Sequence, residues 1–358
     1  MKTYNIALLP GDGIGEEVCA EAVKVLRTIE TKHDVEFNLT HGLIGGAAWP
    51  EHGNHFPDAT KALVDKSDAV LFGSVGGPVD AQFEPQWLDC EKNSILAIRK
   101  HLGASVNLRP APIFKELAHF CPLREDIIGN ESFEILVIRE LSGGIYFGEH
   151  SRPTADSAFD SSTYDRLTIE KIAKFAFNAA KNRNKTLHSI DKANVLETSR
   201  LWREVFEAES KNWPEVTLHN LYVDNAVQQL VKWPRQFDVI ACPNLFGDIV
   251  SDLTSVFPGS LGMLGSASFG DRIHLYEPSG GSAPDIEGLN VANPIAQIYS
   301  TAMMLRHSFE MHDAANAIDA AILKAIQAGF RTGDIYMDGK GETKLSCSEM
   351  GDKICEYL

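Results

Sequence analysis

The sequence predicts an α/β fold. Short apolar runs of strand length alternate with longer segments whose apolar residues recur at helical spacing. This alternation favours a largely parallel sheet that is covered by helices on both faces. The chain has 358 residues, which is enough for about two domains. Because no linker rich in Pro, Gly or Ser divides the chain, we expect the second domain to be inserted into the first.

The first element is expected to be a strand at residues 4–9, which ends at a tight turn at residues 10–13. A helix follows, and the apolar residues at helical spacing on it are Val18, Ala22, Val25 and Ile29. Further strands are expected at residues 35–39, 69–73, 133–139, 143–148, 186–190, 216–223 and 237–241. Further helices are expected at residues 57–66, 168–183, 199–209, 248–256, 294–309 and 313–328, with a last short helix at 347–357.

The composition is that of an ordinary globular protein, with 44% hydrophobic and 23% charged residues. The net charge of −16 argues against binding to nucleic acid or to anionic lipid. A negatively charged substrate would therefore need a local cluster of Arg or Lys. The six cysteines show no zinc spacing, so we expect thiols that pack in the core of a cytoplasmic protein. The first apolar run is too short for a signal peptide or a membrane span.

Three loops are rich in glycine. Residues 11–16 (GDGIGE) fail the dinucleotide fingerprint, because Glu16 stands where the last glycine belongs, and two carboxylates there would repel a pyrophosphate. Tight-turn glycines are the favoured interpretation of that loop. Residues 73–78 (GSVGGP) and 277–286 (EPSGGSAPDI) would allow backbone N–H groups to approach a nucleotide, or they are only turns.

Two aspartates, Asp248 and Asp252, stand four residues apart where a helix is expected to begin. This spacing places both carboxylates on one helix face, within reach of one ion. A third acid, Asp224, follows a strand-like segment. Three hard oxygen ligands with open positions suit Mg²⁺ or Mn²⁺ bound to a chelating substrate. The alternative is that Asp248 caps the helix and Asp252 is a solvated surface acid.

Three arginines stand on segments that are expected to be ordered: Arg99, Arg109 and Arg139. Arg109 is expected at the end of a strand before Pro110, and Arg139 ends an apolar run. A guanidinium group is costly to bury unless it meets an anion, and it suits bidentate capture of a carboxylate. Each arginine could instead pair with a nearby Asp or Glu. The combination with three metal-type aspartates favours a site for a dicarboxylate.

Two further residues complete a candidate reaction centre. Tyr146 lies among glycines in a segment interpreted as a strand, and Lys192 follows the strand at 186–190. A lysine beside buried acids and a cation can have a lowered pKa and serve as a base. The alternatives are that Tyr146 only packs and that Lys192 forms a surface salt bridge with Asp191.

Segments along nearly the whole chain, in order, resemble the metal-dependent β-decarboxylating dehydrogenases of malate-type acids, the isocitrate/isopropylmalate dehydrogenase family. The matching segments are residues 8–15 (LLPGDGIG), 73–78 (GSVGGP), 107–110 (NLRP), 139–141 (REL) with 143–149, 191–196 (DKANVL), 222–224 (YVD), 244–252 (NLFGDIVSD) and 277–293. The resemblance implies two α/β domains around a shared sheet rather than a Rossmann fold. It implies a larger domain, residues 1–104 and 259–358, with most NAD contacts, and an inserted domain, residues 105–258, with the metal aspartates and a dimer interface.

The resemblance also implies roles for single residues. The two carboxylates of the substrate would be held by Arg99, Arg109 and Arg139. Mg²⁺ or Mn²⁺ would be held by Asp224, Asp248 and Asp252, with Asp224 also beside the substrate. Lys192 would take the proton of the C2 hydroxyl as hydride passes to NAD⁺, and Tyr146 would help to protonate C3 after CO₂ has left. In this family the lysine and one metal aspartate come from the partner subunit, so Lys192 and Asp224 imply a homodimer with shared active sites.

Substrate choice within the family depends on the segment before Arg99. Ile95 and Leu96 stand where members that use isopropylmalate carry apolar side chains over the isopropyl group. The resemblance therefore implies oxidative decarboxylation of (2R,3S)-3-isopropylmalate to 4-methyl-2-oxopentanoate and CO₂, in leucine biosynthesis. Tartrate, methylmalate and homoisocitrate stay open, because one aliphatic contact discriminates only about ten- to a hundredfold. A non-catalytic nucleotide-binding subunit is the rival from another class, and it would be expected to lose part of the catalytic set that is present here.

For the cofactor, Asp285 and Ile286 match the NAD-type members, in which the Asp accepts from the adenosine ribose hydroxyls. A carboxylate there would repel a 2′-phosphate. Glu91 matches the acid near the nicotinamide ribose, whereas Gly280 departs from the His that many relatives carry near the adenine. Residues 79–90 match the family poorly. The other residues expected to contact NAD are Gly77, Glu277, Gly281, Ser282, Ala283 and Asn293.

Overall fold

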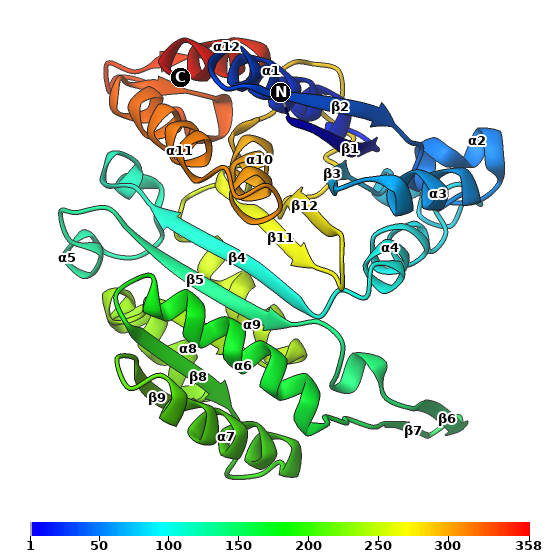
Figure 1. Cartoon of the computed structure of the whole chain (residues 1–358), viewed down its shortest axis with the longest axis vertical. Helices are drawn as coiled ribbons and strands as arrows, with labels where there is room; N and C mark the ends of the chain where they lie inside the picture. Colours follow the sequence, from blue (N-terminus) through cyan, green and yellow to red (C-terminus); the bar gives the residue numbers. More distant parts are fainter. Residues whose placement is uncertain (1) are drawn as a thin grey trace. The chain divides into compact units, whose positions relative to one another are not determined.

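The computed structural model describes residues 2–358, whose elements are drawn in Figure 1. The chain divides into two compact units, Met1–Ala104 with Ser260–Leu358 and Ser105–Gly259. The second unit is therefore an insertion in the first. Both units combine strands and helices, which confirms the expected α/β class.

The first unit has five strands in the order β2-β1-β3-β12-β11. Their bounds are β1 Lys2–Gly11, β2 Val35–His41, β3 Ala69–Ser74, β11 Gly265–Phe269 and β12 His274–Pro278. Neighbouring strands are parallel except for β11 and β12, which are antiparallel. All six residues of β3 are buried, as expected for a strand that is covered on both faces.

The helices of this unit are α1 Gly15–Lys32, α2 Trp49–His52, α3 Asp58–Lys66, α4 Ala97–His101, α10 Ile295–His307, α11 His312–Gln327 and α12 Cys347–Tyr357. Two short strands, β13 Phe330–Arg331 and β14 Thr343–Lys344, pair with each other. Helices α1, α10, α11 and α12 pack on one another (Figure 1). A separate apolar cluster joins Val64 of α3 and Ile98 of α4 to Leu9 and Phe72 of the sheet.

The second unit has five strands in the order β4-β5-β10-β8-β9. Their bounds are β4 Val106–Ile113, β5 Phe133–Glu140, β8 Thr186–Asp191, β9 Thr217–Tyr222 and β10 Val239–Cys242. Only the pair of β4 and β5 is antiparallel among these neighbours. A hairpin of β6 His150–Thr154 and β7 Ser157–Asp160 has every residue exposed.

The helices of the second unit are α5 Glu125–Ile128, α6 Arg166–Lys181, α7 Glu197–Glu209, α8 Val223–Lys232 and α9 Asn244–Ser255. Helix α6 packs against β5, β8 and β10, while α9 contacts β4, β5 and β10. The core on the α9 side includes Val137, Ile240 and Val250. Helix α9, which contains the two aspartates, therefore packs on the strands of the second unit.

Most expected elements are confirmed. The final helix has the expected bounds, and all four apolar residues on the inner face of α1 are buried. Three local predictions are wrong. Residues 145–147 form a 3-10 turn instead of a strand, α9 begins at Asn244 instead of 248, and Val223 begins α8 instead of ending β9. Val223 was placed in the strand because it continues the apolar residues at the end of β9.

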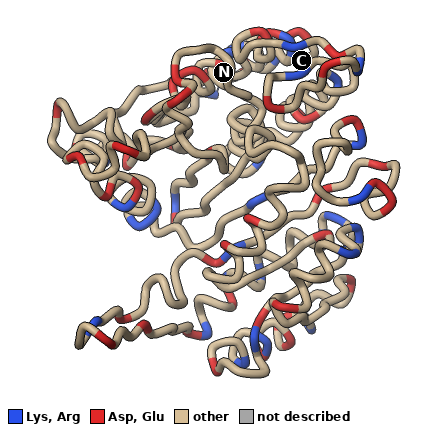
Figure 2. Tube along the Cα trace, turned by 180° about the vertical axis from the view of Figure 1, so that it is seen from behind, with Lys and Arg blue, Asp and Glu red and all other residues tan. Residues whose placement is uncertain are grey.

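Acidic residues occur in both units, and most of the thiols are buried. Figure 2 shows acidic residues spread along both units and intermixed with Lys and Arg. In the described part of the chain, all six cysteines are free and only Cys355 is not buried, which confirms the core-packing role. Burial raises the pKa of the Cys90 thiol to about 12. Among residues 2–358, no helix combines the length and the apolar character that crossing a membrane requires.

Candidate active site

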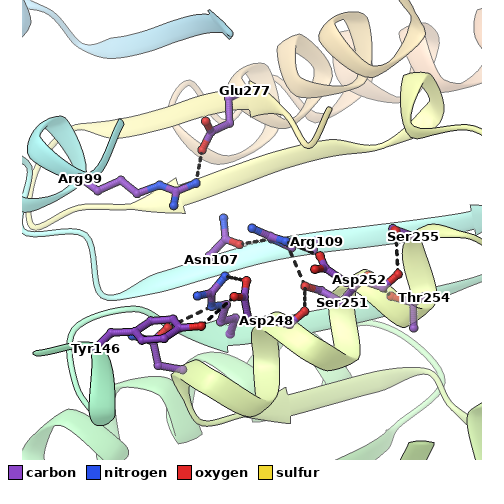
Figure 3. Close-up of polar contacts among 12 residues, drawn as sticks. Arg99, Asn107, Arg109, Tyr146, Asp248, Ser251, Asp252, Thr254, Ser255 and Glu277 are labelled. Carbon is purple, nitrogen blue, oxygen red and sulfur yellow. Dashed lines mark hydrogen bonds and ion pairs between the residues drawn. The ribbon is translucent and has the colours of Figure 1, made fainter. Parts of the chain in front are cut away.

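Helix α9 presents the two aspartates one turn apart. Because the helix begins at Asn244, Asp248 and Asp252 lie inside it, and the prediction that Asp248 caps the helix is wrong. The carboxylate of Asp248 accepts hydrogen bonds from Arg139 Nη1 and, at 2.9 Å, from the Tyr146 hydroxyl (Figure 3). Asp252 is more exposed, and its Oδ1 lies 3.6 Å from Arg109 Nη1.

Arg139 is held rigidly beneath this helix. It is the next-to-last residue of β5, its side chain is buried, and its Nε donates to Asn244 Oδ1 at 3.1 Å. Gly247 makes the approach of α9 possible, because a Cβ atom on it would lie 2.6 Å from Arg139 Cγ and 3.3 Å from its Cα. The close packing of α9 on Arg139 therefore requires a glycine at position 247.

Arg109 approaches the same helix from β4. It lies in the middle of the strand, not at its end as expected, and the strand continues through Pro110 to Ile113. Its Nε donates to Asn107 Oδ1 at 2.8 Å, and its Nη1 donates to Ser251 Oγ at 3.0 Å. Two guanidinium groups and two carboxylates therefore alternate along one face of α9, which suits recognition of a carboxylate substrate together with a cation.

Tyr146 projects toward this cluster from the 3-10 turn Ile145–Phe147, and its position in a strand was wrongly predicted. Its ring lies over the Arg139 guanidinium, 5.7 Å from centroid to Cζ. Burial and the hydrogen bond to Asp248 raise the pKa of the phenol above its usual value. Tyr146 is consequently a protonated hydroxyl near neutral pH, able to donate a proton.

Lys192 and Asp224 form a second group in the same unit. Lys192 follows β8, Asp224 lies in the first turn of α8, and the ammonium group pairs with the carboxylate. Lys192 lowers the pKa of Asp224. The alternative of a Lys192–Asp191 salt bridge is wrong, because the buried Asp191 is bound by Arg203 through two hydrogen bonds of 2.8 and 2.9 Å.

No group of three or more His, Cys, Asp or Glu side chains that could hold a metal ion occurs within residues 2–358 of one chain. Asp248 and Asp252 are brought together by α9, whereas Asp224 pairs with Lys192. Carboxylate oxygens are nevertheless the donors that Mg²⁺ and Mn²⁺ prefer. In the described residues of one chain, Asp224 is therefore not grouped with Asp248 and Asp252.

In the first unit, Arg99 on α4 donates from Nη2 to Glu277 Oε1 at 2.7 Å (Figure 3). Glu277 is buried in β12. Ile95 and Leu96 end a π-helical turn, Lys92–Leu96, that leads into α4. Ile95 packs against the apolar core, while Leu96 is about half exposed at 52%. Leu96 is thus an apolar side chain that is available for contact.

Two of the residues expected to contact the cofactor, Ser282 and Glu91, lie close to the backbone of Gly76. A Cβ atom on Gly76 would lie 3.4 Å from Ser282 Oγ and 3.6 Å from Glu91 Oε1, so these groups border one small notch. Gly281 has nothing within 4 Å of its Cβ direction, and the neighbouring Ala283 has a φ of +41°. Asp285 lies in the same loop as these residues.

Ile286 and Asn293 have packing roles. Ile286 packs with Ile14 against a small core cluster. Asn293 is buried and its Oδ1 accepts from Ile295 N at 3.0 Å, which fixes the start of α10. Gly77 packs under the ring of Trp87.

Asp12 explains the first glycine-rich loop. Its carboxylate accepts backbone N–H groups from Gly46, Ala47 and Gly76 at 2.9, 2.7 and 2.9 Å. Burial raises the pKa of Asp12, and these three donors oppose that rise. The loop is therefore a tight turn around an internal carboxylate, as expected, and its acid faces the protein.

Sequence reasoning missed the residues that orient the arginines. Asn244 joins Arg139 to the Gly143 carbonyl, which accepts from its Nδ2 at 3.1 Å. Asn107 and Ser251 orient Arg109. Ser251 lies between the two aspartates in sequence, and Asn244 follows a strand and a Pro. These positions are weak signals, and they indicate contacts with the arginines only when the neighbouring strands are known.

Comparisons with known proteins agree with this geometry. Residues 5–354 match the family model described as isocitrate/isopropylmalate dehydrogenase. The chain is 51% identical to a 3-isopropylmalate dehydrogenase of Aliivibrio fischeri, with 100% of this chain and 98% of that protein covered. It is 48% identical to one of Haemophilus influenzae, with 100% of both covered.

Two solved structures are similar in fold. The isocitrate dehydrogenase from Methylococcus capsulatus matches with a TM-score of 0.81, 30% identity and 99% of both chains covered. A β-decarboxylating dehydrogenase from Thermococcus kodakarensis matches with a TM-score of 0.80, 33% identity, and 99% of this chain and 96% of that chain covered. The chain belongs to the isocitrate/isopropylmalate dehydrogenase family.

Proposed function

We propose that the protein catalyses the NAD-dependent oxidative decarboxylation of (2R,3S)-3-isopropylmalate to 4-methyl-2-oxopentanoate and CO₂, in leucine biosynthesis. The activity for which the relatives are named, at about 50% identity over the full chain, supports this reaction. The observation that carries it is the face of α9, where Asp248 and Asp252 alternate with Arg139 and Arg109 below the Tyr146 hydroxyl.

The residues of α9 fit a divalent cation. Asp248 and Asp252 would supply two ligands, and Asp224 of a second copy would supply the third. When bound, Mg²⁺ or Mn²⁺ stabilises negative charge at the substrate C2 oxygen, and NAD⁺ provides the hydride acceptor. Arg139, which pairs with Asp248, would bind a substrate carboxylate. Arg109, oriented by Asn107, would bind the same acid, and Arg99 would complete the arginine set.

Two residues move protons. Lys192 would accept the proton of the C2 hydroxyl in its neutral amine form. Its side chain is positioned by Asp224, and its backbone N–H donates to Ser199 Oγ at 3.0 Å. Tyr146 donates a proton to C3 after CO₂ has left, because its raised pKa keeps the phenol protonated. Burial of Arg139 under the Tyr146 ring keeps positive charge near the carboxylates.

Asp224 pairs with Lys192, and it is not grouped with Asp248 and Asp252 in the described residues of one chain; both observations support a homodimer with shared active sites. In a symmetric dimer, Lys192 and Asp224 of each chain would complete the α9 face of the other chain, which gives two equivalent sites. Hydrophobic residues that are exposed on α8 and α9, Val231 and Ile249, provide apolar surface for such an interface. We place the enzyme in the cytoplasm, where the free thiols would stay reduced.

The cofactor and substrate preferences are part of the same proposal. Asp285 would accept from the ribose hydroxyls of NAD⁺ and repel the 2′-phosphate of NADP⁺. Ile95 and Leu96 would contact the isopropyl group of the substrate, because Leu96 is an exposed apolar side chain on the segment before Arg99.

The test is an assay of NADH formation with 3-isopropylmalate and Mg²⁺ or Mn²⁺, with and without a chelator. Parallel assays use tartrate, methylmalate, isocitrate and homoisocitrate. We expect the highest kcat/KM with 3-isopropylmalate and loss of activity in the chelator. Faster turnover of isocitrate or tartrate would reject the substrate assignment, and absence of NADH formation with every acid would reject the dehydrogenase.

A further inference from the structure

Residues 79–90 match the family poorly, and the segment 79–91 that contains them is fixed at both ends by one carboxylate. Asp12 Oδ2 accepts from the backbone N–H of Gly76 at 2.9 Å and from Cys90 Sγ at 3.7 Å. Gly76 precedes the segment and Cys90 lies near its end. The two ends are thereby held close together at the buried Asp12.

Between these ends, Trp87 packs on two glycines. A Cβ atom on Gly46 would lie 2.0 Å from Trp87 Cζ3, and one on Gly77 would lie 2.1 Å from Trp87 Cδ2. The indole therefore lies directly against both backbones, in contact that only glycine permits. The preceding residue adds two polar contacts, since Gln86 Nε2 donates to the Gly46 carbonyl at 3.1 Å and the Gln86 carbonyl accepts from His55 Nε2 at 2.8 Å.

The rest of the segment has few apolar contacts of its own. Val79, Phe83 and Leu88 are 85%, 80% and 50% exposed. Trp87 is thus the large side chain of the segment that is packed on the body of the first unit. Four residues after it stands Glu91, whose carboxylate borders the notch at Gly76 together with the Ser282 hydroxyl.

We propose that Trp87 is a positioning residue that holds Glu91 at this notch for the ribose hydroxyls of NAD⁺. The inference rests on the proposed function, because it takes the notch as part of the cofactor site. A carboxylate that is already in place does not have to be ordered when NAD⁺ binds, so the indole increases the affinity for NAD⁺. The chemical step depends on the residues of α9, which belong to the second unit, whereas Trp87 belongs to the first.

The experiment compares Trp87→Ala with Trp87→Phe. For the alanine variant we expect the Kd for NAD⁺, measured by calorimetry without substrate, and the KM for NAD⁺ to rise about tenfold, while kcat at saturating NAD⁺ stays within about twofold. Phenylalanine keeps a flat ring over Gly46 and Gly77 and should restore most of the affinity. The matched control is Trp213→Ala, which removes a partly buried indole stacked on Phe177 in the second unit and should leave the Kd unchanged.

A double-mutant cycle with Gly46→Ala separates positioning from general destabilisation. Alone, this substitution should displace the indole and raise the Kd as Trp87→Ala does. In the Trp87→Ala background it should add nothing, because the clashing ring is gone. Additive effects, or an unchanged Kd in Trp87→Ala, would overturn the proposal. NADH formation by the unmodified enzyme tests the dehydrogenase separately, so an active enzyme with an unaffected Trp87→Ala variant rejects only this inference.

Discussion

Replacing Gly247 by Ala tests whether the approach of α9 to Arg139 sets the geometry of the site. Gly247 lies inside a helix, and Gly→Ala at such a position normally stabilises by about 0.5–1 kcal/mol. Here the new Cβ would lie 2.6 Å from Arg139 Cγ, 2.9 Å from its Cβ and 3.3 Å from its Cα. The last two atoms belong to the rigid part of a strand residue, so the helix has to move instead.

Overpacking of this kind costs about 1–3 kcal/mol, which outweighs the gain in helix propensity. We therefore expect a net loss of roughly 0.5–2 kcal/mol in the free energy of unfolding, measured by urea denaturation. The same displacement disturbs the contacts of Arg139 with Asn244 and Asp248, and a shift near 1 Å is expected to reduce kcat/KM by about a hundredfold.

Gly333→Ala is the control for Gly247→Ala. Gly333 begins a 3-10 turn, and its Cβ would meet only the flexible end of Lys344 at 3.4 Å or more. That variant should keep its activity. If Gly247→Ala instead stabilised the protein as an ordinary helical alanine does, with normal kcat/KM, the reasoning about α9 and Arg139 would be refuted.

Three further predictions concern the proposed shared site and the buried core. Lys192→Ala and Tyr146→Phe should each reduce kcat at least about a hundredfold. Co-expression of the two variants should restore roughly a quarter of normal activity, because about half of the dimers are mixed and one of their two sites is complete. No recovery would argue against shared sites. Asp248→Asn should raise the Mg²⁺ or Mn²⁺ concentration for half-maximal activity about tenfold or more in a metal titration, and an unchanged curve would remove it as a ligand. Burial lowers the pKa of His188 from 6.5 to about 4, so the unfolded chain binds more protons than the folded protein between these pH values. His188 therefore contributes up to about 3 kcal/mol of stability, which is complete above pH 6.5 and is lost as the pH falls to 4. Urea denaturation should show this loss, and His188→Phe should make the stability less dependent on pH.

Much of the fold could be predicted because burial leaves a regular pattern. Helix α1 repeats apolar residues on one face, and strand β5 contains a continuous apolar run at residues 135–138. Strand β11 was missed because Ser266 and Ser268 are buried polar residues in it, so it lacks an apolar signature. The start of α9 was placed too late because its first turn, Asn244 to Gly247, contains no acidic residue and ends in a glycine.

The candidate site was predictable as a set of residue types, but not as contacts. Sequence spacing could place Asp248 and Asp252 on one face, since they share a helix. It could not place Arg139 and Arg109 beneath that face, because β4, β5 and α9 are distant in the chain and meet only through tertiary packing. The pairing of Lys192 with Asp224 likewise depends on β8 lying beside β9.

The internal carboxylate of Asp12 has a consequence for motion. Loops usually exchange their amide hydrogens quickly, because their N–H groups face water. The amides of Gly46, Ala47 and Gly76 donate to a buried acceptor and should therefore exchange as slowly as those of the sheet core. Three loops of separate sequence origin would then open to solvent together, in one cooperative event. Until that event occurs, this part of the first unit would behave as a single rigid body.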